Sequence, residues 1–251
     1  MAVTIKSERE IALMREAGKI LADVHEKLGE IIAPGITTLD IDRKGEELIR
    51  SYHCIPSFLN YEGYPGSICV SVNDEVVHGI PSKKRHIEEG DIVSLDAGVI
   101  YEGYQSDAAR SYGVGTISEE AEKLIRVTQE SFFKGIEFAK AGNHLFDISK
   151  AIQQHVELNG LSVVRDLVGH GIGSNMHEEP QIPNFKQIGR GMKLRAGMTL
   201  AIEPMVNIGG YDVWILEDDW TVVTRDHSLS AHYENTVLIT DGEPEVLSLL
   251  K

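Results

Sequence analysis

Hydrophobic side chains recur every three or four residues in two separate parts of the chain, and each part begins with a serine followed by acidic residues. Serine is a frequent helix N-cap, and acidic side chains are favourable near the positive end of a helix dipole. The spacing therefore predicts two long helices, one beginning after Ser7 and the other after Ser118. Their apolar positions are Ile11, Met14, Ala17, Leu21, Val24 and Leu28 in the first helix, and Leu124, Val127, Phe132, Ile136 and Phe138 in the second.

The segments that follow the two predicted helices resemble each other. PGITTLDIDRKGEELI (34–49) aligns with AGNHLFDISKAIQQHV (141–156), with a glycine and then an aspartate at matching positions. Each segment predicts a short turn and a second helix. We therefore expect a single domain over residues 1–251, built from a pseudo-repeat with halves at roughly 5–115 and 116–245.

Runs rich in Val, Ile and Thr follow each pair of predicted helices, with Gly and Asp between them. In the first half they are SICVSVNDEVVHG and DIVSLDAGVIYEGYQSDAARSYGVG, and in the second GMTLAIEPMVNI, WILEDDWTVVT and SAHYENTVLIT. Such runs are typical of antiparallel strands and hairpins. The pattern predicts an α+β fold in which two similar halves pool their strands into a central sheet.

The composition is typical of a soluble globular protein, since 42% of the 251 residues are hydrophobic and 25% are charged. Because no run of 18 apolar residues occurs and the start MAVTIKSEREIALM lacks a basic and then apolar segment, we expect neither a membrane span nor a signal peptide. Cys54 and Cys69 do not make a disulfide framework, so the expected compartment is the cytoplasm. The net charge of −15 argues against free nucleic acid as the substrate, and the basic run at 83–86 predicts a solvated loop.

Two aspartates lie on either side of a predicted hairpin turn. Glu102-Gly103 marks the turn in SLDAGVIYEGYQSDAAR, and folding the strands about it brings Asp96 and Asp107 opposite or nearly opposite each other. Neighbouring carboxylates in apolar surroundings repel, so they need a cation or a raised pKa. The alternative is that one aspartate caps the turn and the other faces water. Glu203 and Glu234 weaken this alternative, because they also lie in apolar, strand-like runs where a charge is rarely buried unless paired or metal-bound.

The stretch LVGHGIGSNMHEEP (167–180) adds histidines to this set. Three glycines around His170 disfavour a helix, and in one continuous strand His170 and His177 would face opposite ways. Both can serve one site if the chain turns at Gly173-Ser174-Asn175, whose residue types suit a turn. Four carboxylates and one imidazole make an oxygen-rich set, which fits two divalent metal ions better than one and suits Mn, Fe(II), Co or Zn.

This combination resembles the metal-ligand set of the type I methionine aminopeptidases of the pita-bread, or creatinase–aminopeptidase, family. The motifs that carry the resemblance are Asp96 and Asp107 in the hairpin, His170 in GHGIG, Glu203 in AIEP and Glu234 in YENT. The resemblance covers essentially the whole chain. It implies a pita-bread fold, in which two pseudo-symmetric halves place helices over a curved, mainly antiparallel central sheet.

The resemblance implies a role for each ligand. Asp96 would chelate one metal ion, Asp107 and Glu234 would bridge both, and His170 and Glu203 would complete one site. The nucleophile would be a water or hydroxide between the two metals. Glu203 would also carry the proton of this nucleophile to the leaving amine.

The resemblance further implies residues that bind the substrate. His177 would donate a hydrogen bond to the scissile carbonyl or to the oxyanion that develops on it. His78 in VNDEVVHGIP would contact the scissile amide or the substrate backbone beyond it. Met176 stands where many relatives have an aromatic residue, and Phe58 where some have cysteine, so the shape of the pocket is expected to differ. The apolar pocket for the methionine side chain would be lined by Phe58, Tyr61, Tyr64, Cys69, Met176 and Trp220.

The implied activity is removal of the initiator methionine from nascent proteins when the second residue is small, by a cytoplasmic, monomeric enzyme that works at the ribosome. The acidic run WILEDD before Trp220 argues against this loop as the ribosome contact. One alternative is an X-Pro peptidase of the same fold, which would be expected to carry a further N-terminal domain. Another is a binding module without metals, which five intact ligand positions oppose. Type II enzymes carry an insertion between the last two ligands, and the 30 residues between Glu203 and Glu234 leave no room for it.

Overall fold

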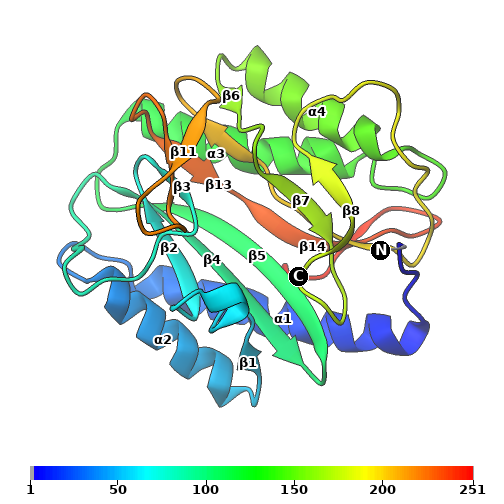
Figure 1. The fold of residues 1–251 in the computed structure, drawn as a ribbon, viewed down its shortest axis with the longest axis horizontal. Coiled ribbons are helices and arrows are strands. Elements are labelled where there is room, and N and C mark those ends of the chain that lie inside the picture. Colours follow the sequence, from blue (N-terminus) through cyan, green and yellow to red (C-terminus); the bar gives the residue numbers. More distant parts are fainter. Residues whose placement is uncertain (1–2, 251) are drawn as a thin grey trace.

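The fold is that of a computed structural model, which describes residues 3–250 of the chain. Its helices lie in two pairs at opposite ends of the molecule, with the strands between them (Figure 1). Among the described residues, none of the helices is both long and apolar enough to cross a membrane. The helices are α1 (Glu8–Ile31), α2 (Thr38–Ser51), α3 (Glu119–Ile136) and α4 (Leu145–Leu158), with a short 3₁₀ helix, η1 (Tyr61–Gly63).

The predicted serine caps begin both long helices. The Ser7 side chain accepts the N–H of Glu10, and the Ser7 N–H donates to the Glu10 carboxylate at 2.6 Å, so α1 begins with a capping box. At the start of α3, Ser118 accepts the N–H of Ala121 at 3.1 Å. One prediction for α3 is wrong, because Phe138 lies beyond the end of the helix and is 41% exposed. Phe138 follows the partly buried Ile136 by two positions, and this spacing is too short to return to the same helix face.

The main sheet joins strands from early and late parts of the chain, and its described pairings are antiparallel. Its order is β1-β4-β5-β14-β9-β7-β8, with β2 paired to β4 and β15 paired to β14. The predicted α+β fold with a mainly antiparallel central sheet is therefore confirmed. The strands are β1 (Ile55–Pro56), β2 (Ile68–Val72), β4 (Ile92–Tyr101), β5 (Tyr104–Gly113), β7 (Val168–Gly171), β8 (Glu178–Pro183), β9 (Thr199–Ile202), β14 (Glu234–Leu238) and β15 (Glu245–Val246).

The remaining described strands form two smaller sheets, which the sequence pattern does not separate from the main one. One has the order β13-β10-β6 and the other β11-β12-β3. The predicted basic loop at 83–86 is confirmed as an exposed segment outside the strands. The bounds are β3 (Glu75–Val77), β6 (Ser162–Val163), β10 (Met205–Asn207), β11 (Val213–Ile215), β12 (Val222–Thr224) and β13 (Ser230–His232).

Each helix pair buries its apolar face against a different group of strands. Leu21 of α1 and Ile41 of α2 belong to one buried cluster with Leu95 of β4. Phe132 of α3 belongs to a second cluster with Leu200 of β9. Different strands of the main sheet therefore pack against different helix pairs. Two separate hydrophobic cores stabilise the sheet that carries the candidate ligands.

A buried carboxylate ties α2 to β2. Oδ1 of Asp42 accepts the backbone N–H groups of Ser67 and Ile68 at 2.7 and 2.9 Å. Burial raises the pKa of Asp42, and the two donors partly offset that effect. Since Cys69 of β2 pairs with Asp96 of β4, this contact fixes the strand beside a candidate metal ligand.

Asp42→Ala is expected to lower the free energy of unfolding by about 2–6 kcal/mol, because two buried N–H groups would lose this acceptor at about 1–3 kcal/mol each. Asp42→Asn is the matched control: the amide oxygen can still accept both bonds, and no charge is buried, so the loss should stay below about 1 kcal/mol. Urea unfolding of both variants measures the difference. An equal loss in the two variants would show that the charge, not the acceptor, stabilises this contact.

Candidate metal centre and substrate pocket

The strand register places three of the predicted ligands on one face of the main sheet. Asp96 of β4 and Glu234 of β14 are both paired with Ala109 of β5, and Asp107 lies two residues before Ala109. Paired residues on neighbouring strands, and residues two apart in one strand, project to the same face. Asp107 pairs with Gly98 and not with Asp96, so the two aspartates are diagonal neighbours, two residues out of direct register.

The other two ligands follow from the next strands of the same sheet. His170 of β7 pairs with Ala201 of β9, and Ala201 pairs with Thr236 of β14. Glu203 lies two residues after Ala201, just beyond the end of β9, and Glu234 lies two residues before Thr236. The side chains at 170, 203 and 234 therefore point to the same side of the sheet. Small alanines between the acids leave room for their carboxylates.

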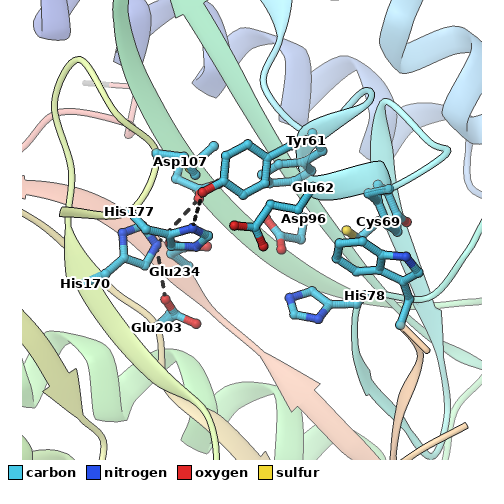
Figure 2. A pocket seen from close by; sticks show the side chains of 14 residues that line it. Tyr61, Glu62, Cys69, His78, Asp96, Asp107, His170, His177, Glu203 and Glu234 are labelled. Carbon is cyan, nitrogen blue, oxygen red and sulfur yellow. Dashed lines mark hydrogen bonds and ion pairs between the residues drawn. The ribbon is translucent and has the colours of Figure 1, made fainter.

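The ligand atoms converge closely on this face. Those of Asp107, His170 and Glu234 all lie within 4.8 Å of one another. Nε2 of His170 lies 3.6 Å from Oε1 of Glu203 and 3.9 Å from Oδ2 of Asp107. Figure 2 shows Asp107, His170, Glu203 and Glu234 gathered on one side of a pocket, with Asp96 between them and the side that carries His78 and Cys69.

The electrostatics of this cluster fit a bound cation. Burial, and next the charges of neighbouring carboxylates, raises the pKa values of Asp96, Glu203 and Glu234 well above the usual range, and burial raises that of Asp107 to about 7. Within residues 3–250, buried oxygens of Asp96, Asp107 and Glu234 have no hydrogen-bond partner. A divalent ion would supply both the missing charge and the missing partners, and an oxygen-rich set with one nitrogen suits Mn, Fe(II), Co or Zn.

His170 is oriented as a neutral ligand. Its Nδ1 lies 2.9 Å from the carbonyl oxygen of Gly171, so this nitrogen carries the proton and donates it. Burial, and next the nearby His177, lowers the pKa of His170 to about 4, so the ring is neutral near pH 7. Nε2 is then left with a free lone pair among the carboxylates, which is the usual arrangement of a metal-binding histidine.

The turn predicted between the two histidines is confirmed. Residues 173–177 form a series of bends between β7 and β8, and a bulge follows His170 in β7. The rings of His170 and His177 meet edge to face with their centroids 4.4 Å apart. Nδ1 of His177 lies 2.8 Å from the hydroxyl of Tyr61. The bend thus brings His177 to the ligand cluster, although the two histidines would point apart in a straight strand.

The pocket that the ligand cluster and the aromatic residues line together has a volume of about 170 Å³. An apolar cavity of roughly 150 Å³ holds a benzene-sized group, so one large side chain fits this space. Trp220 packs edge to face on Tyr64 at 5.1 Å and on His78 at 6.1 Å. The lining includes every site residue predicted from the sequence: Phe58, Tyr61, Tyr64, Cys69, His78, Asp96, Asp107, His170, Met176, His177, Glu203, Trp220 and Glu234.

Glu62 also lines the pocket and was not predicted from the sequence. It is exposed and has a positive φ of 49° inside η1, which turns its side chain toward the pocket in Figure 2. Its charge acts on His177, where it opposes the lowering of the pKa that burial causes. The sequence YEGYP contains a glycine that favours a turn, but a left-handed glutamate beside it is not encoded by any simple pattern.

Comparison with known proteins identifies the family. The profile of metallopeptidase family M24 matches residues 12–241. A methionine aminopeptidase from Clostridium acetobutylicum is 58% identical over 247 residues, which cover 98% of this chain and 99% of that protein. This chain belongs to the methionine aminopeptidases of metallopeptidase family M24. The family predicted from the spacing of the ligand motifs is thereby confirmed.

Solved structures of the family confirm the pita-bread fold. The crystal structure of methionine aminopeptidase from Thermotoga maritima matches with a TM-score of 0.97 at 46% identity, over 99% of this chain and 100% of that one. Xaa-Pro dipeptidase from Bacillus anthracis shares the fold with a TM-score of 0.79 at 24% identity. That match covers 98% of this chain and 62% of the dipeptidase chain.

A divalent metal is expected to stabilise the folded protein. Mn²⁺ or Co²⁺ at 100 times its dissociation constant should raise the free energy of unfolding by about 2.7 kcal/mol, because the unfolded chain has no preformed site. Thermal unfolding with and without metal, after treatment with chelator, measures the effect. Asp107→Ala should abolish the response, whereas Glu62→Gln, at the rim of the same pocket, should retain it. A wild-type protein that does not respond to either metal would contradict the assignment.

Proposed function

We propose that this protein removes the N-terminal methionine from peptides and nascent proteins whose second residue is small. The observation that carries the proposal is that one pocket joins a buried carboxylate–imidazole cluster to an apolar space for a single side chain. Membership of the methionine aminopeptidases supports the same conclusion. The scissile bond would lie where the two parts of the pocket meet.

We propose that the cluster holds two divalent ions. Asp96 would chelate one, His170 and Glu203 would complete the other, and Asp107 and Glu234 would bridge the two. When bound, such ions lower the pKa of a shared water and make it a nucleophile near neutral pH. The buried carboxyl of Glu203, whose pKa burial raises, is suited to hold the proton of the nucleophile and pass it to the leaving amine.

We propose that His177 stabilises the oxyanion that develops on the scissile carbonyl. Burial lowers the pKa of His177, so its ring is neutral near pH 7. Its Nδ1 lies 2.8 Å from the hydroxyl of Tyr61. In the proposed tautomer this hydroxyl donates to Nδ1, and the proton on Nε2 is the donor to substrate. His78, whose pKa burial lowers to about 4, would contact the scissile amide in the same neutral state.

The proposed methionine pocket is apolar and adaptable. Cys69 is buried with a free thiol, and burial raises its pKa well above the usual range, so it acts as an apolar wall. Tyr64 is held in place because its hydroxyl donates to the carbonyl of Gly79 at 2.9 Å. The methyl group of Met176 lies close to Gly98, where a Cβ atom would come within 2.9 Å of it. Met176 and Phe58 would thus shape one side of the pocket.

We further propose that residues 1–251 act as one catalytic domain with pseudo-symmetric halves at roughly 5–115 and 116–245. In support, Asp40 and Asp147 each accept the N–H of the residue that caps α2 and α4, at matching positions of the aligned segments. We propose a monomer in the cytoplasm that meets nascent chains at the ribosome. The exposed acidic tip at 217–219 would not contact ribosomal RNA, because like charges repel.

The proposed specificity predicts that Met-Ala-Ser loses its first residue much faster than Leu-Ala-Ser or Met-Pro-Ser. The unbranched thioether fits the adaptable pocket, whereas Leu is branched and proline removes the amide proton and fixes φ. Release of the first amino acid from each tripeptide, with and without chelator, measures this. Preference for Met-Pro-Ser would favour an X-Pro peptidase, and equal rates or insensitivity to chelator would refute the proposal.

His177→Ala is expected to keep its metal content and lose about 10²–10³-fold in kcat, as is typical when one oxyanion donor is removed. Asp107→Ala should instead lose metal and activity together. Metal analysis of the purified variants alongside the Met-Ala-Ser assay separates the two roles. Loss of metal from His177→Ala would show that this histidine is a ligand, contrary to the proposal.

A further inference from the structure

The segment that carries Met176 and His177 is attached to the rest of the protein at both ends. At its beginning, the N–H of Ile172 donates to the carbonyl of Thr199 at 3.1 Å, and the hydroxyl of Thr199 donates to the carbonyl of Ile172 at 2.5 Å. At its end, Oε1 of Glu178 accepts the N–H of Asn175 at 3.3 Å. The residues between these contacts have no regular secondary structure. The N–H of Gln105 donates to the carbonyl of Gly173 at 2.8 Å, and Tyr61 contacts the His177 ring, so the end attachments act together with these contacts to place the ring.

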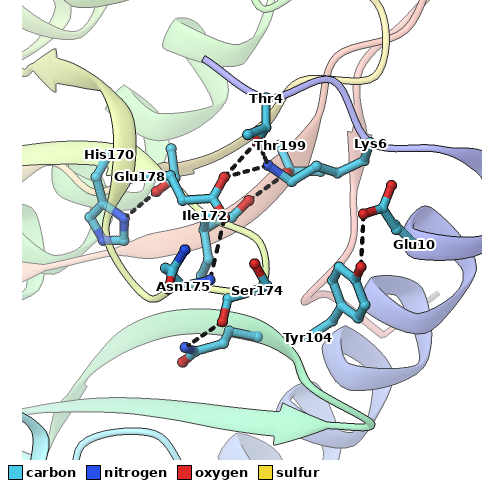
Figure 3. A network of polar contacts seen from close by, with 12 residues as sticks. Thr4, Lys6, Glu10, Tyr104, His170, Ile172, Ser174, Asn175, Glu178 and Thr199 are labelled. Carbon is cyan, nitrogen blue, oxygen red and sulfur yellow. Dashed lines mark hydrogen bonds and ion pairs between the residues drawn. The ribbon is translucent and has the colours of Figure 1, made fainter. Parts of the chain in front are cut away.

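The second carboxylate oxygen of Glu178 binds residues from the extreme N-terminal part of the described chain. Oε2 accepts Nζ of Lys6 at 2.6 Å and the hydroxyl of Thr4 at 2.6 Å, and Lys6 also donates to Thr4. The side chains of Lys6 and Glu178 are only 5% and 8% exposed. Figure 3 shows this group, which we name the N-terminal clamp (Thr4, Lys6 and Glu178), between the arm before α1 and the bend after His170.

The clamp is anchored and tightly packed. The backbone N–H of Lys6 donates to the carbonyl of Gly197 at 2.8 Å, just before β9 begins. A Cβ atom on Gly173 would come within 2.5 Å of both Cε of Lys6 and Oε1 of Glu178. The bend therefore passes in direct contact with the ion pair, and a side chain at position 173 would have to displace the ends of Lys6 and Glu178. A shift of Lys6 would be transmitted to the bend, because the contact leaves no free space between them.

We propose that the N-terminal clamp is a positioning device for catalysis: Lys6 holds Glu178 so that the adjacent His177 is directed at the substrate carbonyl. The geometry favours this role over simple stabilisation. Glu178 follows His177 directly in the chain and bonds on one side to the bend and on the other to the arm. Removing Lys6 would leave a buried carboxylate without its cation, which would move toward solvent and carry His177 with it.

The expected effect of Lys6→Met, which keeps the length of the side chain and removes its charge, is a loss of about 10- to 100-fold in kcat on Met-Ala-Ser, since small misplacements of a catalytic group cost this much. Metal content should stay at the wild-type level because the five ligands lie outside the clamp. Lys6→Arg, which keeps the cation, should restore kcat to within about threefold of wild type. If Lys6→Met does not fold, Thr4→Val removes one donor more gently and should lower kcat about threefold.

Arg15→Met is the matched control. Nη2 of Arg15 pairs with Oε2 of Glu245 at 2.7 Å, an ion pair between α1 and β15 that does not involve the bend. Its loss should leave kcat within about twofold of wild type. A fall in kcat equal to that of Lys6→Met would overturn the proposal, because it would show that any loss of an ion pair near α1 has the same effect.

A double-mutant cycle tests whether Lys6 acts through His177. If it does, Lys6→Met should lower kcat little further in the His177→Ala background, so that the two losses are strongly non-additive. Additive losses would show that Lys6 acts by another route and would overturn the proposal. The activity readout rests on the proposed function.

Hydrogen exchange of the metal-loaded protein gives an independent readout. Lys6→Met should accelerate exchange in peptides that cover residues 172–178, and Arg15→Met should not. Unchanged exchange in this segment would refute the clamp even if the activity assays succeed. An inactive wild type with accelerated exchange in Lys6→Met would refute the proposed aminopeptidase function and leave the mechanical role of the clamp supported.

Discussion

The mutual repulsion of buried carboxylates is the constraint on which the rest of this structure depends. Asp96, Asp107, Glu203 and Glu234 lie together on one face of the sheet, where burial weakens the screening of their charges by water. An isolated loop could not hold such a set, because its carboxylates would separate into solvent. Strands that are hydrogen-bonded to one another can hold these carboxylates together, because the backbone hydrogen bonds fix the position of each Cα. The helix pairs bury the opposite face of the strands.

A partly buried cation supports the same cluster from the opposite face of the sheet. Arg110 follows Ala109 on β5, so its side chain lies on the face opposite the carboxylates. Its guanidinium donates to the backbone carbonyls of Ala109 and Glu234 and, at 2.6 Å, to Oδ1 of Asn235. Arg110 therefore ties β5 to β14 where these strands carry Asp107 and Glu234. Its positive charge also offsets, to a small degree, the raised pKa of Glu234.

The imidazoles of the pocket are suited to work as neutral groups. Burial lowers the pKa values of His78 and His170 to about 4 and also lowers that of His177. A neutral ring can offer a lone pair to a metal or a single N–H to an oxyanion, and its neighbour decides which nitrogen does so. For His170 this neighbour is the Gly171 carbonyl, and for His177 it is the Tyr61 hydroxyl. The two histidines thus differ in the group that Nδ1 faces, a backbone carbonyl for one and a tyrosine hydroxyl for the other.

The sequence by itself determined the features that depend on neighbours along the chain. The Ser7 and Ser118 caps involve residues three positions apart, and the hairpin turn at Glu102-Gly103 is set by two residues with φ of 47° and 85°. The order of the ligand motifs also identified the family and the candidate site residues without any coordinates. Helix caps and hairpin turns can be predicted from the sequence because the interactions that stabilise them join residues only a few positions apart.

The tertiary structure alone decided how distant segments meet. The diagonal offset of Asp96 and Asp107 depends on a register that the hydrophobic pattern leaves open, because a shift of two residues keeps every side chain on its own face. The approach of Glu62 to the pocket depends on a left-handed backbone. Lys6 and Glu178 are 172 positions apart in the sequence, where a lysine would be expected on the surface. Lys6 becomes buried against Glu178 because its backbone N–H binds Gly197, just before β9, and this contact places the N-terminal arm beside the bend. Long-range contacts of this kind arise from packing, which no short stretch of sequence encodes.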